Sequence, residues 1–285
     1  MVIGTEQNQS TSMGTSTEDA ILESIHLQDQ QLKTIEEEQK AFPLVGEKVP
    51  ISTLVAMYDP KESPAFFSKA NELAATYSHM RIIRGDGNCY LRAVQVGLFE
   101  ILLKDRDRLT EFIWNCKEWK GRLTKLGFQY WAREICDNFV EFTLQVRSLM
   151  RTIEEVLVKM NDDETANYYI IFFRLISSGF LREHAAEYEP FITNGMNMVK
   201  YCESEVEAMW KESDHIGVIA LVRALNIRLR IEYMDRNAAP NGGTEYNIPD
   251  GADNDTFVPD ITLLYRPGHY DLIYKKSEET PLSSQ

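Results

Sequence analysis

The sequence predicts one α+β domain in which a small mixed β-sheet is covered by many α-helices. Strand-like runs lie near residue 80 and in the last sixty residues, and the stretch between them shows helical spacing. The chain has 285 residues, of which 44% are hydrophobic. That content suffices for one large core with short terminal segments. We expect the domain at residues 41–276, after an N-terminal arm at residues 1–40 and before a polar C-terminal tail at residues 277–285.

The N-terminal arm is expected to start without structure and then to form an acidic amphipathic helix. Residues 1–15 are rich in Ser, Thr, Gln and Gly, a composition that buries too little apolar surface to fold. A capping-box pattern begins at Ser16, and apolar residues then recur at helical spacing as far as Lys40. The arm holds eight acidic residues against two lysines. It could pack on its own domain or dock a partner.

A strand, a tight loop and a buried helix are predicted around Cys89. Residues 80–84 have strand composition, turn formers come next, and residues 91–103 are almost continuously apolar. Cys89 would lie in the first turn of the helix, where free N–H groups and the helix dipole favour a thiolate. Gly85 and Gly87 would give the loop positive φ and bring N–H groups near a substrate carbonyl. The stretch alone also fits an ordinary turn before a buried cysteine.

The middle of the chain is predicted to be helical, because apolar residues recur every three or four positions. Cys116, Cys136 and Cys202 fall on apolar faces and are expected to be small core residues. Either Ser213 or Asp214 would cap the last of these helices. The expected helices cover residues 109–126, 131–140, 152–160, 165–181 and 215–225.

The sheet is completed by residues 227–234 and by a hairpin near the C-terminus. Residues 227–234 alternate between apolar and charged side chains, which predicts a half-exposed strand. The next stretch, residues 235–259, is rich in Gly, Pro, Asn and Asp and is expected to be a long loop. Residues 261–265 and 270–274 then form the two hairpin strands on either side of Arg266-Pro267-Gly268.

The hairpin carries a histidine and an acid that suit a cysteine nucleophile. His269 opens the final strand, and Asp271 shares its face because residues i and i+2 of a strand point the same way. A carboxylate there can hold one ring nitrogen and leave the other facing a sulfur. His269 could equally be a surface residue beside a turn, and His184 and His215 are weaker candidates for the base. An early cysteine with a late histidine beside an acid is, however, the order of a papain-like cysteine hydrolase.

These motifs resemble those of the ovarian-tumour (OTU) cysteine deubiquitinases, and among them the otubains. The resemblance implies a papain-like OTU protease fold, with Cys89 as nucleophile, His269 as general base, Asp271 as its orienting acid and Asp86 as a further catalytic residue of the loop. Tyr90-Leu91 replaces the Phe-Tyr or Phe-Phe that is usual after the cysteine, which leaves the catalytic atoms unchanged. Within residues 43–275, the matching stretches are Asp86-Gly87-Asn88-Cys89 with Arg92-Ala93, Glu212-Ser213-Asp214-His215-Ile216, Glu232-Tyr233-Met234-Asp235-Arg236 and Leu264-Tyr265-Arg266-Pro267-Gly268-His269-Tyr270-Asp271.

The resemblance implies a thiol isopeptidase that cleaves ubiquitin from lysine side chains and prefers K48-linked chains. Cys89 would attack the isopeptide carbonyl, N–H groups of the Gly87 and Asn88 loop would stabilise the oxyanion, and His269 would protonate the leaving amine. No metal or organic cofactor is needed. Aromatic and acidic residues near His269 are nominated as ubiquitin contacts, although the tyrosines could be ordinary strand residues: Tyr233, Asp235, Tyr265 and Tyr270.

Two other functions fit the same residues. The family includes a member that restrains ubiquitin-charged E2 enzymes without its cysteine, partly through an N-terminal helix, so residues 1–40 could dock ubiquitin or an E2. A third possibility is a papain-like hydrolase that acts on a ubiquitin-like modifier or another amide.

The net charge of −14 argues against nucleic acid and anionic membranes as partners. Four cysteines without close pairing indicate a reducing compartment. We expect a soluble monomer of the cytoplasm, and also of the nucleus, with ubiquitin, polyubiquitin chains and E2 enzymes as partners.

Overall fold

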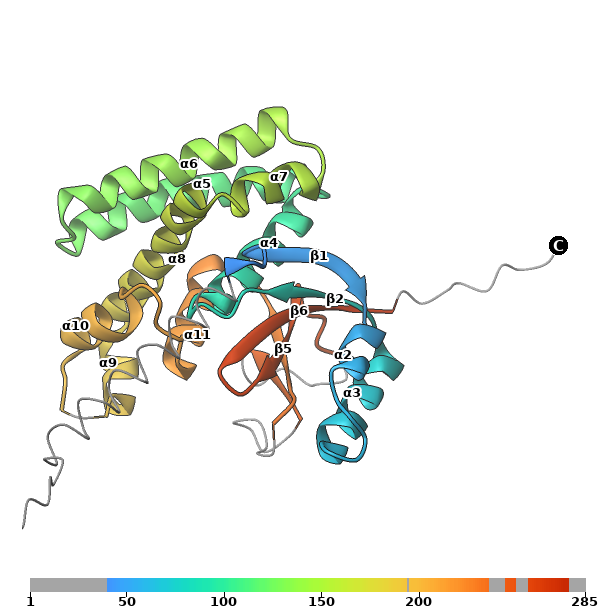
Figure 1. Ribbon diagram of the computed structural model, residues 1–285. Coiled ribbons are helices and arrows are strands. Elements are labelled where there is room, and N and C mark those ends of the chain that lie inside the picture. Colours follow the sequence, from blue (N-terminus) through green and yellow to red (C-terminus); the bar gives the residue numbers. More distant parts are fainter. Residues whose placement is uncertain (1–39, 194, 236–243, 250–255, 277–285) are drawn as a thin grey trace, which may run out of the picture. The chain divides into compact units, whose positions relative to one another are not determined.

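The computed structural model describes residues 40–193, 195–235, 244–249 and 256–276. The chain divides into two compact units between Phe42 and Pro43, and the elements described here belong to the second unit. A mixed six-stranded sheet forms its centre (Figure 1). The expected N-terminal helix up to residue 39 and the C-terminal tail lie outside the described residues.

The strands lie in the order β1-β2-β6-β5-β3-β4. β3 and β5 are parallel, whereas every other neighbouring pair is antiparallel. The predicted hairpin is present, and its register pairs Arg266 with His269. Because β2 lies directly beside β6, the strand that leads to Cys89 neighbours the strand that carries His269. The strands are β1 (Val45–Pro50), β2 (Tyr77–Ile83), β3 (Leu229–Tyr233), β4 (Glu245–Ile248), β5 (Ile261–Arg266) and β6 (His269–Lys275).

The two edge strands differ from the sequence prediction. β1 pairs with β2 at one edge and β4 pairs with β3 at the other. β4 lies inside residues 235–259, so the prediction of a continuous loop there is wrong. The sequence of β1, VGEKVP, has no regular alternation of apolar and polar residues. That of β4, EYNI, alternates over four residues only, inside a stretch rich in turn formers, so periodicity reveals neither strand.

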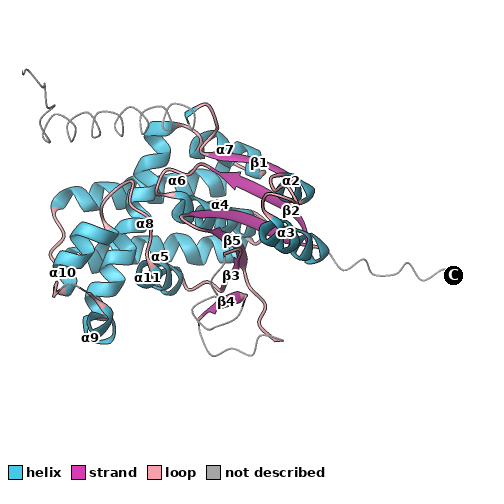
Figure 2. Ribbon diagram, turned by 60° about the horizontal axis from the view of Figure 1, so that its bottom comes forward, coloured by secondary structure: helices cyan, strands magenta, loops and turns pink. Residues whose placement is uncertain are grey.

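Helices cover both faces of the sheet (Figures 1 and 2). On one face, Met80 and Leu264 form a small core with Leu54 of α2 and Leu73 of α3. On the other face α4 packs against β5 and β6, and the longer helices enclose it in the main core. The helices are α2 (Ser52–Ala56), α3 (Pro64–Thr76), α4 (Cys89–Leu102), α5 (Arg106–Lys125), α6 (Tyr130–Leu149), α7 (Ile153–Met160), α8 (Asp163–Glu183), α9 (Ala185–Tyr188), α10 (Met198–Tyr201) and α11 (His215–Leu225).

The helices expected in the middle of the chain correspond to α5, α6, α7, α8 and α11. Asp214 caps α11, its carboxylate accepting the Gly217 N–H at 2.9 Å. Cys116, Cys136 and Cys202 are buried, as predicted, and burial raises the pKa of Cys136 to about 12 and that of Cys202 to about 11. Thiols with such pKa values are poor nucleophiles at neutral pH. Of the helices described, none is both long and apolar enough to cross a membrane.

β3 is more buried than its alternating sequence predicts. Glu232 is 8% exposed, and its carboxylate accepts a hydrogen bond from the Tyr77 hydroxyl at 2.5 Å. Burial raises the pKa of Glu232, while the hydrogen bond from Tyr77 opposes that change. The prediction of a half-exposed strand is therefore wrong at Glu232, because α3 and the start of β2 cover this face of β3.

Candidate active site

Cys89 is the first residue of α4 and comes directly after the loop that leaves β2. Its side chain is buried, and the helix behind it is buried nearly all round, including Val94 and Phe99. A helix held in this way fixes the position of its first residue. The structure thus places Cys89 where the sequence predicts it.

His269 and Asp271 lie on one face of β6, as the strand periodicity predicts. The Nε2 atom of His269 lies 3.0 Å from Oδ1 of Asp271, and the ring lies close enough to Cys89 for the two groups to interact. With Nε2 engaged by the acid, Nδ1 is the nitrogen available to the sulfur. The fully buried Asp271 also accepts the Ile83 N–H at 2.9 Å and a hydrogen bond from Arg266. Cysteine, histidine and acid are therefore assembled in one place.

The charges at this site favour a protonated imidazole. Burial lowers the pKa of His269, but the hydrogen bonds and charges of Asp271 and Cys89 outweigh burial and raise the pKa to about 9. Burial raises the pKa of Asp271, but His269, Arg266 and the Ile83 N–H together lower it below its ordinary value. At neutral pH Asp271 is ionised and His269 is protonated. The charged ring lies beside Cys89 and can give its proton to a leaving group.

Asp86 lies in the loop but shapes it instead of contacting His269. Its Oδ1 accepts the Asn88 N–H at 2.9 Å, and its Oδ2 accepts bonds of 2.7 and 3.1 Å from Arg92. Arg92 is fully buried and donates to Asn167 of α8 at 3.0 Å. The carboxylate therefore ties the loop to the first turns of α4.

Of the backbone N–H groups of residues 86–89, two donate hydrogen bonds within the loop and two do not. The Asp86 N–H donates to the Arg84 carbonyl at 3.1 Å, and the Asn88 N–H is used by Asp86. In the described part of the chain, the N–H groups of Gly87 and Cys89 have no acceptor. Of the two residues predicted to stabilise an oxyanion, Gly87 keeps its N–H free, whereas Asn88 uses its own inside the loop.

Gly87 occupies a position that no other residue fits. Its φ is +72°, and a Cβ there would lie 2.2 Å from the Trp210 carbonyl oxygen. The same freedom was expected for Gly85, but Gly85 is not among the residues with positive φ. That expectation is wrong, because the chain turns at Gly87 alone.

Substituting Gly87 by alanine is expected to damage both stability and catalysis. The strained φ and the backbone clash should lower the free energy of unfolding by about 1–3 kcal/mol. The loop displacement should lower kcat/KM about 100-fold. Urea unfolding and steady-state cleavage measure the two effects. Gly85→Ala is the matched control, expected within about 0.5 kcal/mol of wild type; equal damage by both substitutions would contradict the assignment.

Three of the four residues predicted to bind ubiquitin form a ladder across the sheet. Tyr233 of β3, Tyr265 of β5 and Tyr270 of β6 are in register, and successive ring centroids are 5.0 Å apart. The ladder lines a cavity of about 340 Å³ together with Glu212 and His215. Because Tyr270 is the residue directly after His269, this cavity borders the catalytic residues.

Asp235, the fourth residue, lies apart from the ladder. It lines a separate cavity with Phe66 and Lys69 of α3. Residues i and i+2 share a face only within a strand. Because β3 ends at Tyr233, the side chains of Tyr233 and Asp235 diverge.

The structure also shows where the alternative bases lie and which residues of the site the sequence did not reveal. His184 stacks on Phe180, and His215 packs beside Tyr246, so neither replaces His269. Sequence reasoning missed Arg266, which binds Asp271, and Arg174, which binds the loop. The signal for Arg174 was a single charge inside the apolar run of α8.

Comparisons with known proteins agree with this geometry. The family model described as Peptidase C65 Otubain matches residues 37–275. A Caenorhabditis briggsae protein named "Ubiquitin thioesterase otubain-like" is 64% identical over 283 residues, 98% of this chain and 97% of its own length. Human "Ubiquitin thioesterase OTUB1" is 36% identical over 236 residues, 82% of this chain and 83% of its own length.

Solved structures give the same result. A ceOTUB1 chain in a complex with ubiquitin aldehyde and UBC13~Ub is 53% identical, with a TM-score of 0.82 over 87% of this chain and 100% of that one. A h/ceOTUB1 chain solved with ubiquitin aldehyde and UBCH5B~Ub is 48% identical, with a TM-score of 0.81 over 90% of this chain and all of the other. The predicted papain-like OTU fold is thereby confirmed. The chain belongs to the otubain family of cysteine peptidases.

Proposed function

We propose that this protein is a cysteine isopeptidase that removes ubiquitin from lysine side chains and prefers K48-linked chains. The observation that carries the proposal is Cys89 at the start of α4 beside the His269–Asp271 pair. The names of the relatives, which are ubiquitin thioesterases, support ubiquitin as the substrate. Four free cysteines within the described chain support action in the reducing cytoplasm or nucleus.

The reaction starts from the thiolate of Cys89 and the protonated ring of His269. The thiolate forms a bond to the isopeptide carbonyl carbon, and the free N–H groups of Gly87 and Cys89 donate to the resulting oxyanion. His269 gives its Nδ1 proton to the lysine nitrogen as the C–N bond breaks. The products of this half are the free lysine amine and a thioester between Cys89 and the ubiquitin C-terminus.

The second half releases ubiquitin. The neutral His269 removes a proton from water, and the resulting hydroxide attacks the thioester carbon. When this intermediate collapses, Cys89 leaves as the thiolate and ubiquitin leaves as a carboxylic acid, which gives its proton to solvent. Asp271 holds the ring in one orientation and stabilises the imidazolium that this step restores.

A panel of di-ubiquitins of every linkage, with Cys89→Ala as the blank, tests the proposal. We expect K48-linked di-ubiquitin to be cleaved at least about tenfold faster than the other linkages. Similar rates for all linkages would remove the preference and leave the isopeptidase in place. If the wild type cleaves none of them, the proposed function fails.

The tyrosine ladder is proposed to bind the ubiquitin whose C-terminus enters the site. Tyr233→Ala should raise KM about tenfold and leave kcat within about twofold, because it removes binding area away from the reacting atoms. Steady-state kinetics on di-ubiquitin measure both constants. Tyr130→Ala, which removes a tyrosine that is 70% exposed on α6, should change neither constant. A loss confined to kcat would contradict a binding role.

A second role is favoured by the solved relatives. Their structures contain ubiquitin-charged E2 enzymes as well as ubiquitin aldehyde. We propose that this protein also binds a charged E2 and slows its discharge, independently of cleavage. The N-terminal arm expected to help in this lies outside the described residues up to residue 39, and its role stays a prediction. The Cys89→Ala variant separates the two roles.

A further inference from the structure

Asn88 stands at the N-cap of α4 without capping the helix. Asn is a preferred N-cap residue because its side-chain oxygen accepts an N–H of the first turn. Asn197 does this for α10, with ψ of 165° and a 3.0 Å bond from the Lys200 N–H. Asn88 has φ of −111° and ψ of 5°, and it makes no such bond. The Asn88 side chain therefore supplies no acceptor to the first-turn N–H groups of α4.

Arg174 holds the Asn88 side chain away from the helix. This arginine comes from α8 and is 2% exposed. Its Nη2 and Nε atoms donate to Asn88 Oδ1 at 2.7 and 3.2 Å, and Nη2 also donates to the Gly87 carbonyl at 3.2 Å. One guanidinium thus fixes the Asn88 side chain and the peptide group that precedes it.

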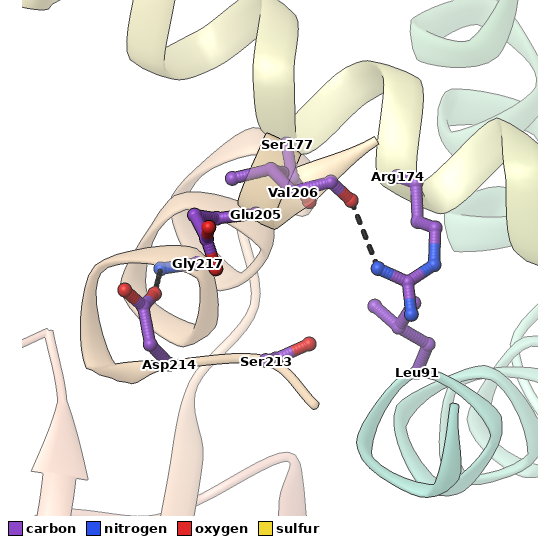
Figure 3. Close-up of a pocket in the computed structure, with 8 residues that line it drawn as sticks. All are labelled: Leu91, Arg174, Ser177, Glu205, Val206, Ser213, Asp214 and Gly217. Carbon is purple, nitrogen blue, oxygen red and sulfur yellow. Dashed lines mark hydrogen bonds between the residues drawn. The ribbon is translucent and has the colours of Figure 1, made fainter. Parts of the chain in front are cut away.

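The same guanidinium anchors the segment that borders the loop. Nη1 donates to the Val206 carbonyl at 2.9 Å (Figure 3), and Nη2 donates to the Lys211 carbonyl at 2.7 Å. Between these two residues, Trp210 places its carbonyl against Gly87. Burial lowers the pKa of Arg174 to about 10, so the group stays charged at neutral pH.

We propose that Arg174 is a positioning residue that keeps the oxyanion site open. By retaining the Asn88 oxygen, it keeps ψ of Asn88 at 5° instead of the 165° that the capping residue Asn197 shows, and because this ψ sets the direction of the Cys89 N–H, that donor keeps its place. This inference rests on the proposed reaction at Cys89. Asn88 Nδ2 is buried and has no acceptor within the described chain. A buried donor without a partner costs stability, so stability alone does not explain the arrangement.

Weakening the grip of Arg174 should release the Asn88 side chain. Asn88 would then rotate to the ordinary cap conformation and accept a first-turn N–H. The change in ψ that this cap conformation requires would turn the Cys89 N–H, and the substrate oxyanion would lose that donor. The loss of activity should therefore depend on the presence of the Asn88 side chain.

Arg174→Lys tests this, because lysine keeps the charge but cannot donate from a planar fork. On K48-linked di-ubiquitin, kcat should fall about 10–100-fold, with KM within about twofold. Binding of ubiquitin aldehyde, whose adduct places an oxygen in the oxyanion position, should weaken by a similar factor. Alkylation of Cys89 by iodoacetamide forms no oxyanion and should stay within about threefold of wild type.

Two further variants sharpen the test. Adding Asn88→Ala to Arg174→Lys should restore kcat at least about fivefold, because no side chain is left to cap the helix. Arg182→Lys is the matched control, since Arg182 lies on the same helix and pairs with Glu207 at 2.6 Å without contacting the loop. It should leave kcat, aldehyde binding and alkylation unchanged.

The contrary outcomes are distinct. A wild type that neither cleaves di-ubiquitin nor binds the aldehyde overturns the proposed function. If the wild type is active and Arg174→Lys has the same kcat and the same affinity for the aldehyde, the inference is overturned. An Arg174→Lys variant that loses alkylation together with aldehyde binding, or a double variant no faster than the single one, also overturns it, because Arg174 would then serve folding alone.

Discussion

Cys89→Ala is expected to lower the rate of isopeptide cleavage by about 10⁵-fold or more, because no other group can form the acyl intermediate. The remaining cysteines are buried in helices. The smaller side chain removes one sulfur from a buried position, so the fold should survive, with a loss of about 1–2 kcal/mol in the free energy of unfolding. Single-turnover cleavage of K48-linked di-ubiquitin measures the rate, and urea unfolding measures the stability.

The same variant decides between the two proposed roles. Because ubiquitin and a charged E2 contact surfaces and not the thiol, their dissociation constants should stay within about threefold of wild type. Discharge of ubiquitin from the E2 should be slowed as strongly by Cys89→Ala as by wild type. If restraint disappears together with cleavage, the second role depends on the thiol and the proposal of an independent function fails.

Asp271→Asn is expected to lower kcat about 10³-fold, because a neutral amide can neither hold the histidine tautomer firmly nor stabilise its charged form. Asp271 is completely buried and also binds Arg266 and the Ile83 N–H. Leaving Arg266 without its carboxylate should lower the free energy of unfolding by about 3 kcal/mol. Steady-state kinetics and urea unfolding measure the two losses.

The pH profile of kcat/KM should also differ between the wild type and Asp271→Asn. The wild type should lose kcat/KM as pH rises through about 9, where His269 gives up its proton. Without the Asp271 carboxylate, the hydrogen bond and charge that raise the pKa of His269 most are lost, so this pKa falls and the alkaline limb should move to lower pH. Since the pKa of folded His269 lies above its ordinary value of 6.5, protonated His269 stabilises the fold below pH 6.5, and this contribution fades towards pH 9. The variant should lack that decline.

Asp137→Asn provides the control for this experiment. Asp137 also carries an ion pair, with Lys120 at 2.6 Å, but its side chain is 59% exposed. Exposed pairs contribute less than about 1 kcal/mol, so neither activity nor its pH profile should change. An alkaline limb that stays in place in Asp271→Asn would show that the acid does not set the protonation of His269.

The parts of the site that sequence reasoning predicts are those that one local rule determines. Cys89 is predicted by turn formers before an apolar helix, and Asp271 by its place two residues after His269 on a strand. The strand rule stops where β3 ends at Tyr233, and Asp235 lines a different cavity from the tyrosines. The edge strand β1 was missed because its sequence has no period, and β4 because its alternation covers only four residues.

Contacts between distant segments could not be predicted at all. Arg174 lies 86 positions from Asn88, and only the packing of α8 on the loop brings them together. In the sequence it is one charge in an apolar helix, which indicates a buried partner but does not say which one. The same holds for Asn88: Asn is a preferred N-cap residue, but the remote Arg174 holds its side-chain oxygen.

The pairing of β2 with β6 has a consequence for the synthesis of the protein. Cys89 comes after the first of these strands and His269 begins the second, about 180 residues later. Contacts of such long range form late, because the intervening chain must be ordered before its ends can meet. On the ribosome, the thiol therefore emerges well before its histidine and meets it only after nearly the whole chain has been made. A nascent chain carries the nucleophile without the base, so the peptidase becomes active only when its last strand is in place.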